Sequence, residues 1–161
     1  MDGETNSKRF YSVEIAVCEA YTELGQIPQE SMTVIRERAG FDIQRINEIE
    51  AEVKHDIIAF LTSVAEHAGP ESRFIHMGMT SSDLLDTGLA LQMKEAGQQL
   101  LQRIEAVLDA LGKRAAEFKY TPMMGRSHGV HAEPTTFGLK LALFYDEMQR
   151  NKRRMLQALE A

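Results

Sequence analysis

The chain has 161 residues, of which 43% are hydrophobic, so it is long enough and apolar enough for one packed domain, or for one domain and the start of another. Its formal charge of −6 disfavours nucleic acid and anionic membrane surfaces as partners, and without any run of about 18 apolar residues we expect no membrane span. The single cysteine, Cys18, allows no internal disulfide, which fits a reducing compartment and an expected cytoplasmic location.

Apolar spacing predicts three helices in the first part of the chain. The first helix carries apolar residues at steps of three and four and stops at Gly25; they are Phe10, Val13, Val17, Tyr21 and Leu24. Pro28 suits the first turn of a short second helix that ends near Gly40. Asp42 is a good N-cap for a third helix, which Gly69-Pro70 closes; its apolar stripe is Ile43, Ile46, Ile49, Val53, Ile57, Leu61, Val64 and Ala68.

A polar connection to Met79 leads into a fourth, long helix. Asp83 follows Thr80 by three residues, as in a capping box. The later apolar seam of this helix is Leu101, Ile104, Leu108, Leu111, Ala115 and Phe118. Gly88 and Gly97 each weaken it by about 1 kcal/mol relative to alanine, and close helix packing is the usual reason for such glycines.

The last helix is expected to begin near Pro134. Its buried side is predicted to consist of Phe137, Leu141, Phe144, Met148, Met155 and Leu159. This pattern reaches Ala161 without a stop signal, so we expect the chain to be a piece of a longer protein, cut inside a helix. Residues 119–133 lack periodicity, and no segment of the chain gives a convincing strand signal. The predicted fold class is therefore all-α.

Polar chemistry is concentrated between Gly125 and Thr136, in a segment with two glycines that joins two predicted helices. Histidine titrates near neutral pH, so His128 and His131 are natural candidates for a general acid or base. The alternative is a histidine that only satisfies backbone groups in a tight loop. A zinc site needs three or four ligands, and H-x-x-H alone is weak evidence for one, so we expect no metal.

Two other segments allow both a structural and a functional interpretation. Lys54, His55 and Asp56 lie on the polar side of the third predicted helix, which is either a solvated face or a cleft wall where a cation and an imidazole meet an anionic ligand. Residues 76–83 place hydroxyls at a helix start, which serves either as a simple cap or as a carboxylate or phosphate site.

Three blocks of the sequence, in the same order, resemble the adenylosuccinate lyase family of the fumarase/aspartase superfamily. The blocks are Lys54-His55-Asp56-Ile57-Ile58-Ala59-Phe60, His76-Met77-Gly78-Met79-Thr80-Ser81-Ser82-Asp83-Leu84-Leu85-Asp86-Thr87, and the run from Thr121 to Lys140. The similarity extends from about Arg9 to Ala161. It implies an N-terminal helical domain at residues 1–80 and the start of a central helical bundle at residues 81–161.

The resemblance implies a lyase that eliminates fumarate from adenylosuccinate, giving AMP, and from the succinyl-carboxamide intermediate of purine synthesis. His128 would be the general acid that protonates the leaving nitrogen. The substrate-binding residues would be Lys54, His55, Asp56, His76, Thr80 and Ser81, with Thr80 and Ser81 at the succinyl carboxylate. No cofactor is implied, the partner is the small-molecule substrate, and the parent protein would be a homotetramer.

Some features depart from the family pattern. The family's base is a serine on a loop far downstream of Ala161, so the piece alone is expected to be inactive. Lys54 stands where many members have arginine, which keeps the charge but loses the planar donor fork, and Ser127 replaces a common threonine. The alternatives are a non-catalytic helical interaction module and another lyase of the superfamily, such as one acting on argininosuccinate or a carboxymuconate.

Overall fold

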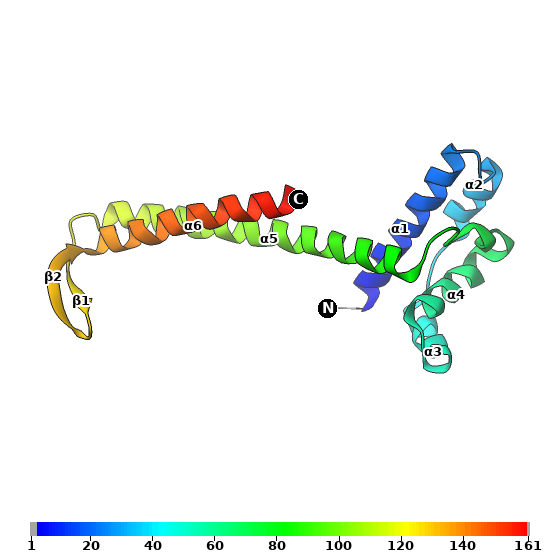
Figure 1. The fold of residues 1–161 in the computed structure, drawn as a ribbon, viewed down its shortest axis with the longest axis horizontal. Helices are drawn as coiled ribbons and strands as arrows, with labels where there is room; N and C mark the ends of the chain where they lie inside the picture. Colours follow the sequence, from blue (N-terminus) through cyan, green and yellow to red (C-terminus); the bar gives the residue numbers. More distant parts are fainter. Residues whose placement is uncertain (1–2, 161) are drawn as a thin grey trace. The chain divides into compact units, whose positions relative to one another are not determined.

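The computed structural model describes residues 3–160, which are mostly helical (Figure 1). In chain order the elements are α1 (Gly3–Glu23), α2 (Gln29–Arg38), α3 (Ile43–Val53), α4 (Asp56–Ala68), the 3₁₀ helix η1 (Gly69–Phe74), α5 (Ser81–Glu117), β1 (Pro122–Ser127), β2 (Val130–Thr136) and α6 (Phe137–Glu160). The predicted all-α class is confirmed, with a small two-stranded sheet in addition. Among the described helices, none is long and apolar enough to cross a membrane.

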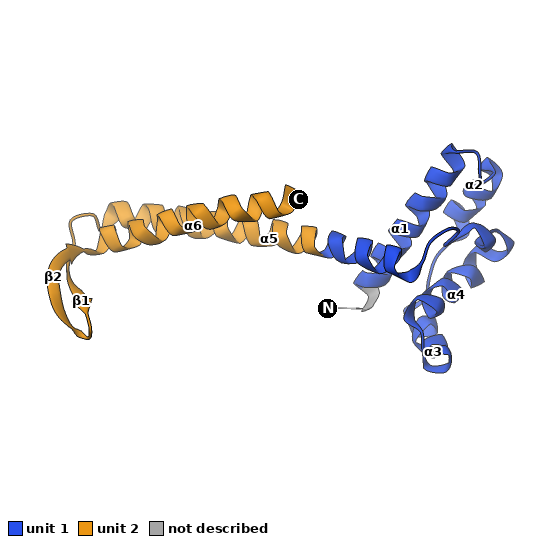
Figure 2. Cartoon of the chain, in the orientation of Figure 1, with its two compact units in different colours: residues 1–92 blue, residues 93–161 orange. Residues whose placement is uncertain are grey.

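The chain forms two compact units, residues 1–92 and residues 93–161, and α5 contributes to both (Figure 2). The division expected from the family resemblance, at residues 80 and 81, stays a prediction. The expected continuation of the last helix at Ala161 lies outside the described residues.

Several helix boundaries follow the predicted signals. Gly25, with a φ of 71°, lies two residues after the end of α1, and α2 begins after Pro28. The Asp42 side chain accepts a hydrogen bond of 2.7 Å from the N–H of Arg45 and so caps α3. These short-range signals act within one helical turn, so the sequence alone is enough to place them.

The prediction of one continuous helix from Asp42 to Ala68 is wrong, because the chain breaks between α3 and α4. Lys54 ends α3 in the left-handed conformation, with a φ of 56°, and His55 is extended. The apolar stripe conceals this break, since Val53 and Ile57 keep a spacing of four residues across it. Residues 54–56 are therefore a helix junction rather than part of one polar helix face.

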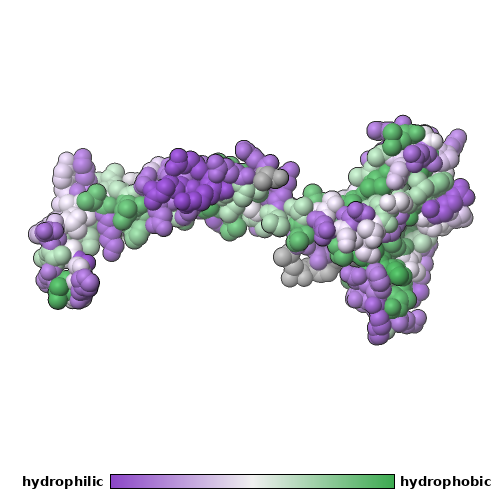
Figure 3. Space-filling model, viewed as in Figure 1, coloured by the Kyte–Doolittle hydropathy of each residue, from purple (hydrophilic) through white to green (hydrophobic). Residues whose placement is uncertain are grey.

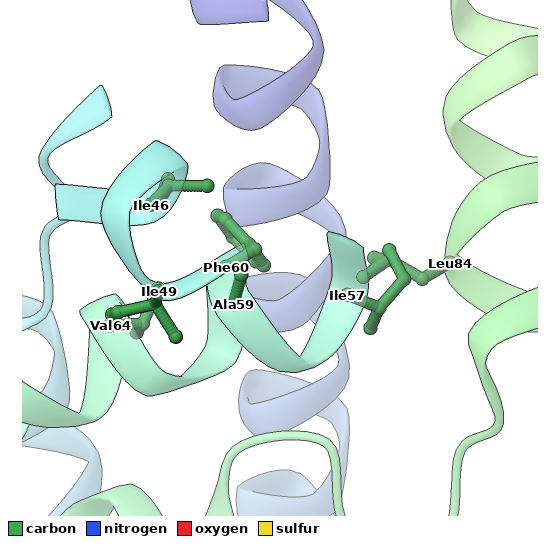
Figure 4. Packing of buried hydrophobic residues seen from close by; sticks show 7 residues of the cluster. All are labelled: Ile46, Ile49, Ile57, Ala59, Phe60, Val64 and Leu84. Atoms are coloured by element: carbon green, nitrogen blue, oxygen red, sulfur yellow. The ribbon is translucent and has the colours of Figure 1, made fainter. Parts of the chain in front are cut away.

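The main core of the first unit lies between α3, α4 and the start of α5. Its buried members are Ile46, Ile49, Ile57, Ala59, Phe60, Val64 and Leu84 (Figure 4). Figure 4 shows Ile57 and Leu84 pointing toward one another, which joins the start of α4 to the start of α5. The Phe60 ring also packs against Phe10 and Phe41, each at a centroid distance of 5.9 Å. Burying one such aromatic side chain stabilises the fold by about 1.5–3 kcal/mol.

A second apolar cluster joins α1 to α2. Its buried members are Cys18, Ile27, Met32 and Ile35. Phe74 and Ile75 pack against it from the segment that follows α4. The loop that leads into α5 is therefore packed onto α1, which becomes important at His76.

The expectation that no strand is present is wrong for residues 122–136, which form the antiparallel hairpin of β1 and β2. Both faces of the hairpin are largely exposed, so its residues show no alternation of apolar and polar side chains. Pro134 suggests the first turn of a helix although it lies in β2. The helix α6 begins three residues later, at Phe137. Phe137 packs against Phe118 at 5.2 Å and closes the base of the hairpin.

Close packing accounts for the two helix-interior glycines of α5. A Cβ on Gly88 would lie 2.8 Å from Cε1 of Phe10, and one on Gly97 would lie 2.5 Å from Cδ2 of Leu159. Both distances are shorter than atoms tolerate, so a larger residue would have to displace the side chain of Phe10 or of Leu159. A salt bridge of 2.8 Å between Lys152 and Glu105 adds a polar contact between α5 and α6.

The helix α6 has apolar residues on more than the side that contacts α5. Of the predicted buried side, Leu141, Met148, Met155 and Leu159 are half-buried, whereas Phe137 and Phe144 are 36% and 42% exposed. Leu139, Leu143 and Leu156 are also exposed. Hydrophilic side chains cover much of α6 on the face that Figure 3 presents. The second unit consequently leaves much of its apolar surface uncovered by its own residues.

Candidate functional site

Each of the three sequence blocks contains one residue with an unusual backbone conformation. Lys54, His76 and His128 have φ angles of 56°, 64° and 52°, and no other non-glycine residue within the described range 3–160 has a positive φ. A side chain makes this conformation costly, by about 1 kcal/mol or more, so it persists where the surroundings enforce it. Such positions cluster at functional sites, which supports a functional interpretation of all three blocks.

At the junction of α3 and α4, two polar side chains act as caps. The Nδ1 atom of His55 accepts a long hydrogen bond of 3.4 Å from the N–H of Ile58, and Asp56 Oδ1 accepts one of 2.8 Å from the N–H of Ile57. The side chains of His55 and Asp56 remain 43% and 59% exposed. The junction therefore presents Lys54, His55 and Asp56 together to solvent at a point fixed by two helix ends.

His76 is held by a carboxylate that the sequence did not reveal as functional. Glu14 on α1 is buried, with a side chain only 1% exposed. Its Oε2 accepts a hydrogen bond of 2.9 Å from the N–H of His76, and its Oε1 lies 2.6 Å from Nδ1 of the same residue. One glutamate thus binds both the backbone and the ring of His76, which sequence reasoning missed because an isolated Glu on a helix suggests a solvated position.

Thr80 and Ser81 occupy the start of α5. The carboxylate of Asp83 accepts a hydrogen bond of 2.8 Å from the N–H of Thr80, which confirms the predicted capping pattern. This carboxylate satisfies an amide that an anionic ligand would otherwise use, and its charge opposes an anion. The groups that remain for a ligand here are the hydroxyls of exposed Thr80 and half-buried Ser81.

His128 lies at the tip of the hairpin. It forms a two-residue turn with Gly129 between the paired residues Ser127 and Val130. The φ angles of His128 and Gly129 are 52° and 76°, as a type I′ turn requires, and this turn matches the twist of the strands. The tight turn leaves His128 exposed.

A bulge lower in the hairpin depends on Gly125. The pairing of β1 with β2 shifts between Met124 and Arg126. A Cβ on Gly125 would lie 2.6 Å from the carbonyl oxygen of Glu133, so only glycine fits there. Between this strand and α6 lies a hollow with a mainly apolar lining, to which Met124, Arg126 and Leu143 contribute and His128 does not.

The predicted site residues fall into two groups. Lys54, His55, Asp56, His76, Thr80 and Ser81 belong to the first unit, and His128 belongs to the second. Within residues 3–160, no three potential His, Cys, Asp or Glu ligands gather around a common point that would hold a metal ion. The arrangement offers exposed imidazoles, one ammonium group and hydroxyls, a set suited to proton transfer and to binding anionic groups.

Comparison with known proteins gives one family and a consistent set of relatives. A family model described as lyase matches residues 2–161. The adenylosuccinate lyase of Bacillus subtilis (strain 168) is 52% identical over 157 residues, which are 96% of this chain and 36% of that protein. The adenylosuccinate lyase of Aquifex aeolicus (strain VF5) is 49% identical over 156 residues, 95% of this chain and 36% of the relative. The chain thus spans about a third of the length of these curated relatives.

Solved structures share the fold. The fumarate lyase from Mesorhizobium sp. BNC1 matches with a TM-score of 0.91 at 29% identity, over 97% of this chain and 38% of that one. The 3-carboxy-cis,cis-muconate lactonizing enzyme from Pseudomonas putida matches with a TM-score of 0.83 at 26% identity, over 96% of this chain and 36% of that one. Proteins named for different reactions therefore share this arrangement of elements.

Proposed function

Because this chain belongs to the lyase family, we propose that it is part of an adenylosuccinate lyase, a C–N lyase of purine biosynthesis. The enzyme would release fumarate from adenylosuccinate, giving AMP, and from the succinyl-carboxamide intermediate of the same pathway. The observation that carries the proposal is the identity of about 50% to proteins of that name across nearly the whole chain. Since those proteins are longer, the activity is proposed for a protein of their full length that contains this chain.

The reaction is a β-elimination that breaks a C–N bond. A base removes a proton from the carbon next to a carboxylate, and an acid protonates the departing nitrogen. A positioned acid contributes about 10²–10⁴-fold to the rate. Negative charge that develops on the substrate spreads into its carboxylate, so fixed hydrogen-bond donors around that group stabilise the transition state. The reaction needs no cofactor.

In this proposal His128 is the acid. Its place in a tight, exposed turn suits a group that must reach into a site formed together with other parts of the protein. Lys54, His55 and Asp56 contact the substrate, with His55 near the phosphate. His76 lines the same pocket, and the hydroxyls of Thr80 and Ser81 hold the succinyl carboxylate.

Replacement of His128 tests the assignment of the acid. His128→Asn is the sharpest variant, because Asn-Gly is the preferred dipeptide of a type I′ turn and the hairpin should be retained. In the full-length protein we expect this variant to lose about 10²–10⁴-fold in kcat for fumarate release, followed by absorbance. An imidazole is lost while the turn is kept, so the change reports on chemistry.

His131→Ala is the matched control, since His131 lies in the same hairpin and is also exposed. We expect it to keep turnover within about tenfold of the wild type. If His128→Asn instead keeps its turnover and His131→Ala loses it, the acid is misassigned. His128→Ala separates the two effects further, because alanine removes the imidazole and also disfavours the turn.

Two alternatives are distinguished by substrate. The likeness to a muconate lactonizing enzyme keeps another reaction of the superfamily open, as does an argininosuccinate lyase. Turnover of argininosuccinate or of a carboxymuconate, but not of adenylosuccinate, would replace the proposal. A folded full-length protein without any of these activities would favour the helical interaction module.

We also propose a cytoplasmic homo-oligomer, with a tetramer as the expected form. The exposed apolar residues Leu139, Leu143 and Leu156 on α6 support association, because a solitary helix pair seldom leaves so many uncovered. The single cysteine supports a reducing compartment.

A further inference from the structure

We propose that Glu14 is the positioning residue of His76, whose buried carboxylate fixes the proton of the imidazole on Nδ1 and thereby leaves Nε2 as the atom that meets the substrate. This inference rests on the proposed function only in taking Nε2 to meet a substrate, because the contact between Glu14 and His76 lies within this chain. It assigns a role to a carboxylate that the reaction scheme does not use.

The contact between Glu14 and His76 decides which ring nitrogen carries the proton. Both oxygens of Glu14 are engaged by His76, Oε2 with the backbone N–H at 2.9 Å and Oε1 with the ring Nδ1 at 2.6 Å. A short contact between a carboxylate and a ring nitrogen requires a hydrogen atom between them, because two lone pairs repel. The hydrogen therefore belongs on Nδ1, and the ring cannot rotate without losing this bond.

The state of the second ring nitrogen follows from the first. In a neutral imidazole only one nitrogen carries a proton, so Nε2 has a free lone pair and accepts a hydrogen bond. In the imidazolium form Nε2 also carries a proton and donates to an anion such as phosphate or carboxylate. In both forms Glu14 keeps Nδ1 occupied, and the ring, whose side chain is 19% exposed, offers the ligand one atom.

A row of residues on α1 holds the whole loop around His76. Glu14, Cys18 and Tyr21 lie on one helix face, at steps of four and three residues. The Cys18 thiol donates to the carbonyl of Phe74 at 3.6 Å. A Cβ on Gly78 would lie 2.6 Å from the hydroxyl oxygen of Tyr21. Three successive contacts thus align the loop that leads to Thr80 and Ser81.

The backbone conformation of His76 is unfavourable and needs contacts that stabilise it. Its φ of 64° is unfavourable for a residue with a side chain. The hydrogen bond from the His76 N–H to Glu14 Oε2 stabilises this conformation directly. A carboxylate that served stability alone would need only that bond, whereas the second bond, to the ring, sets the direction and the tautomer of the imidazole.

The tautomer is measured by NMR on the 161-residue chain with ¹⁵N-labelled histidine. Long-range ¹H–¹⁵N spectra distinguish a protonated from an unprotonated ring nitrogen, and His76→Gln identifies the signals of this residue by their loss. We expect Nδ1 of His76 to be protonated in the wild-type chain. A ring with the proton on Nε2 only, or one that exchanges between tautomers as free histidine does, overturns the proposal.

Glu14→Gln tests the cause of this preference. The amide keeps the shape but has one oxygen and one NH₂ group, so it cannot accept from both partners. We expect the Nδ1 proton of His76 to lose its preference, and Glu19→Gln on the same helix, which alters the exposed ion pair with Arg36, to leave the spectrum unchanged. An unchanged spectrum in folded Glu14→Gln overturns the proposal. Should that variant fail to fold, the wild-type spectrum decides.

Kinetics of the full-length protein separate positioning from structural support. We expect Glu14→Gln to raise KM by about tenfold to a hundredfold with little change in kcat, as the loss of a charged hydrogen bond that orients a binding group predicts. A fall in kcat with unchanged KM contradicts the assignment. If the wild-type protein releases no fumarate, the proposed function fails, whereas the NMR result still judges the role of Glu14.

Discussion

Arg45 on α3 and Glu66 on α4 form a two-pronged ion pair across the junction at Lys54 and His55. The Nη2 atom of Arg45 lies 2.9 Å from Oε1 of Glu66, and its Nε lies 3.1 Å from Oε2. The pair joins the two helices whose ends present the first candidate binding residues. Both side chains are partly exposed, so its effect on stability is expected to be modest and sensitive to salt.

The ionised carboxylate of Glu66 should stabilise the fold near neutral pH and lose this effect in acid. Hydrogen bonds from Arg45 hold the pKa of the Glu66 carboxyl below its usual range. In the unfolded chain this carboxyl has its ordinary pKa of about 4.3, so the unfolded state binds the proton first as the pH falls. The stabilisation is therefore complete above that value and is lost as the pH falls through the folded-state pKa. We expect Glu66→Gln to lower the thermal midpoint at pH 7, with a difference from wild type that shrinks below pH 4.

Glu71→Gln is the matched control for this measurement. Glu71 also pairs with an arginine, Arg73, but through a single contact of 3.4 Å. We expect a smaller change at pH 7. A gap between Glu66→Gln and wild type that stays constant or widens in acid contradicts the role given to the pair.

The free energy of unfolding should be lower with lysine at position 54 than with glycine there. Its φ of 56° costs a lysine about 1 kcal/mol that glycine does not incur. We therefore expect Lys54→Gly to raise the unfolding free energy of the chain by about 1 kcal/mol, measured by urea denaturation.

Lys94→Gly provides a control of opposite sign, because Lys94 lies in the interior of α5. The same substitution there should lower the unfolding free energy by about 1 kcal/mol. If both variants are destabilised equally, the left-handed cap at Lys54 does not carry the cost assigned to it. In the full-length protein, the proposed contact between Lys54 and the substrate predicts that Lys54→Gly raises KM, because the charge is lost.

Cys18 should be unreactive in the folded chain. Its thiol is fully buried, and burial, together with the nearby charges of Glu14 and Glu19, raises its pKa to about 11. Thiolate is the reactive form, so modification by iodoacetamide at pH 8 should be slow without denaturant and fast in urea. Complete modification at equal rates in both conditions would show that α1 does not stay packed on the loop of residues 74–78.

Leu143 tests the uncovered surface of α6. This side chain is 62% exposed and borders the apolar hollow beside β1. We expect the chain to self-associate and to bind a hydrophobic dye, and Leu143→Lys to weaken both, measured by sedimentation and fluorescence. Gln157→Lys adds the same charge to the same helix without removing an apolar group. Equal effects of the two variants would attribute the change to charge alone.

Much of the helical framework could be predicted from the sequence because the signals are local. Asp42 caps α3 and Asp83 caps α5 within three residues of their partners. The break at Lys54 could not be predicted, since the apolar stripe passes across it and lysine has no special preference for a left-handed cap. The hairpin was missed because its exposed faces carry no alternating pattern.

Part of the proposed site can be suggested from the sequence alone. His55, His76 and His128 are candidates because histidine suits proton transfer and because three blocks resemble a family. Glu14 did not stand out, since its partner is 62 residues away and only the folded chain brings the two together. A buried carboxylate of this kind depends on tertiary packing, which a single sequence does not display.

The three left-handed residues set a limit on how this chain can be improved. Glycine tolerates a positive φ, so Lys54, His76 and His128 are the first positions at which to place it in a more heat-resistant variant. Glycine would relax the backbone at each position, but at His76 it would also take the ring partner away from the buried Glu14 carboxylate. Together the three changes would remove an ammonium group and two imidazoles, which are the groups that the proposed function requires.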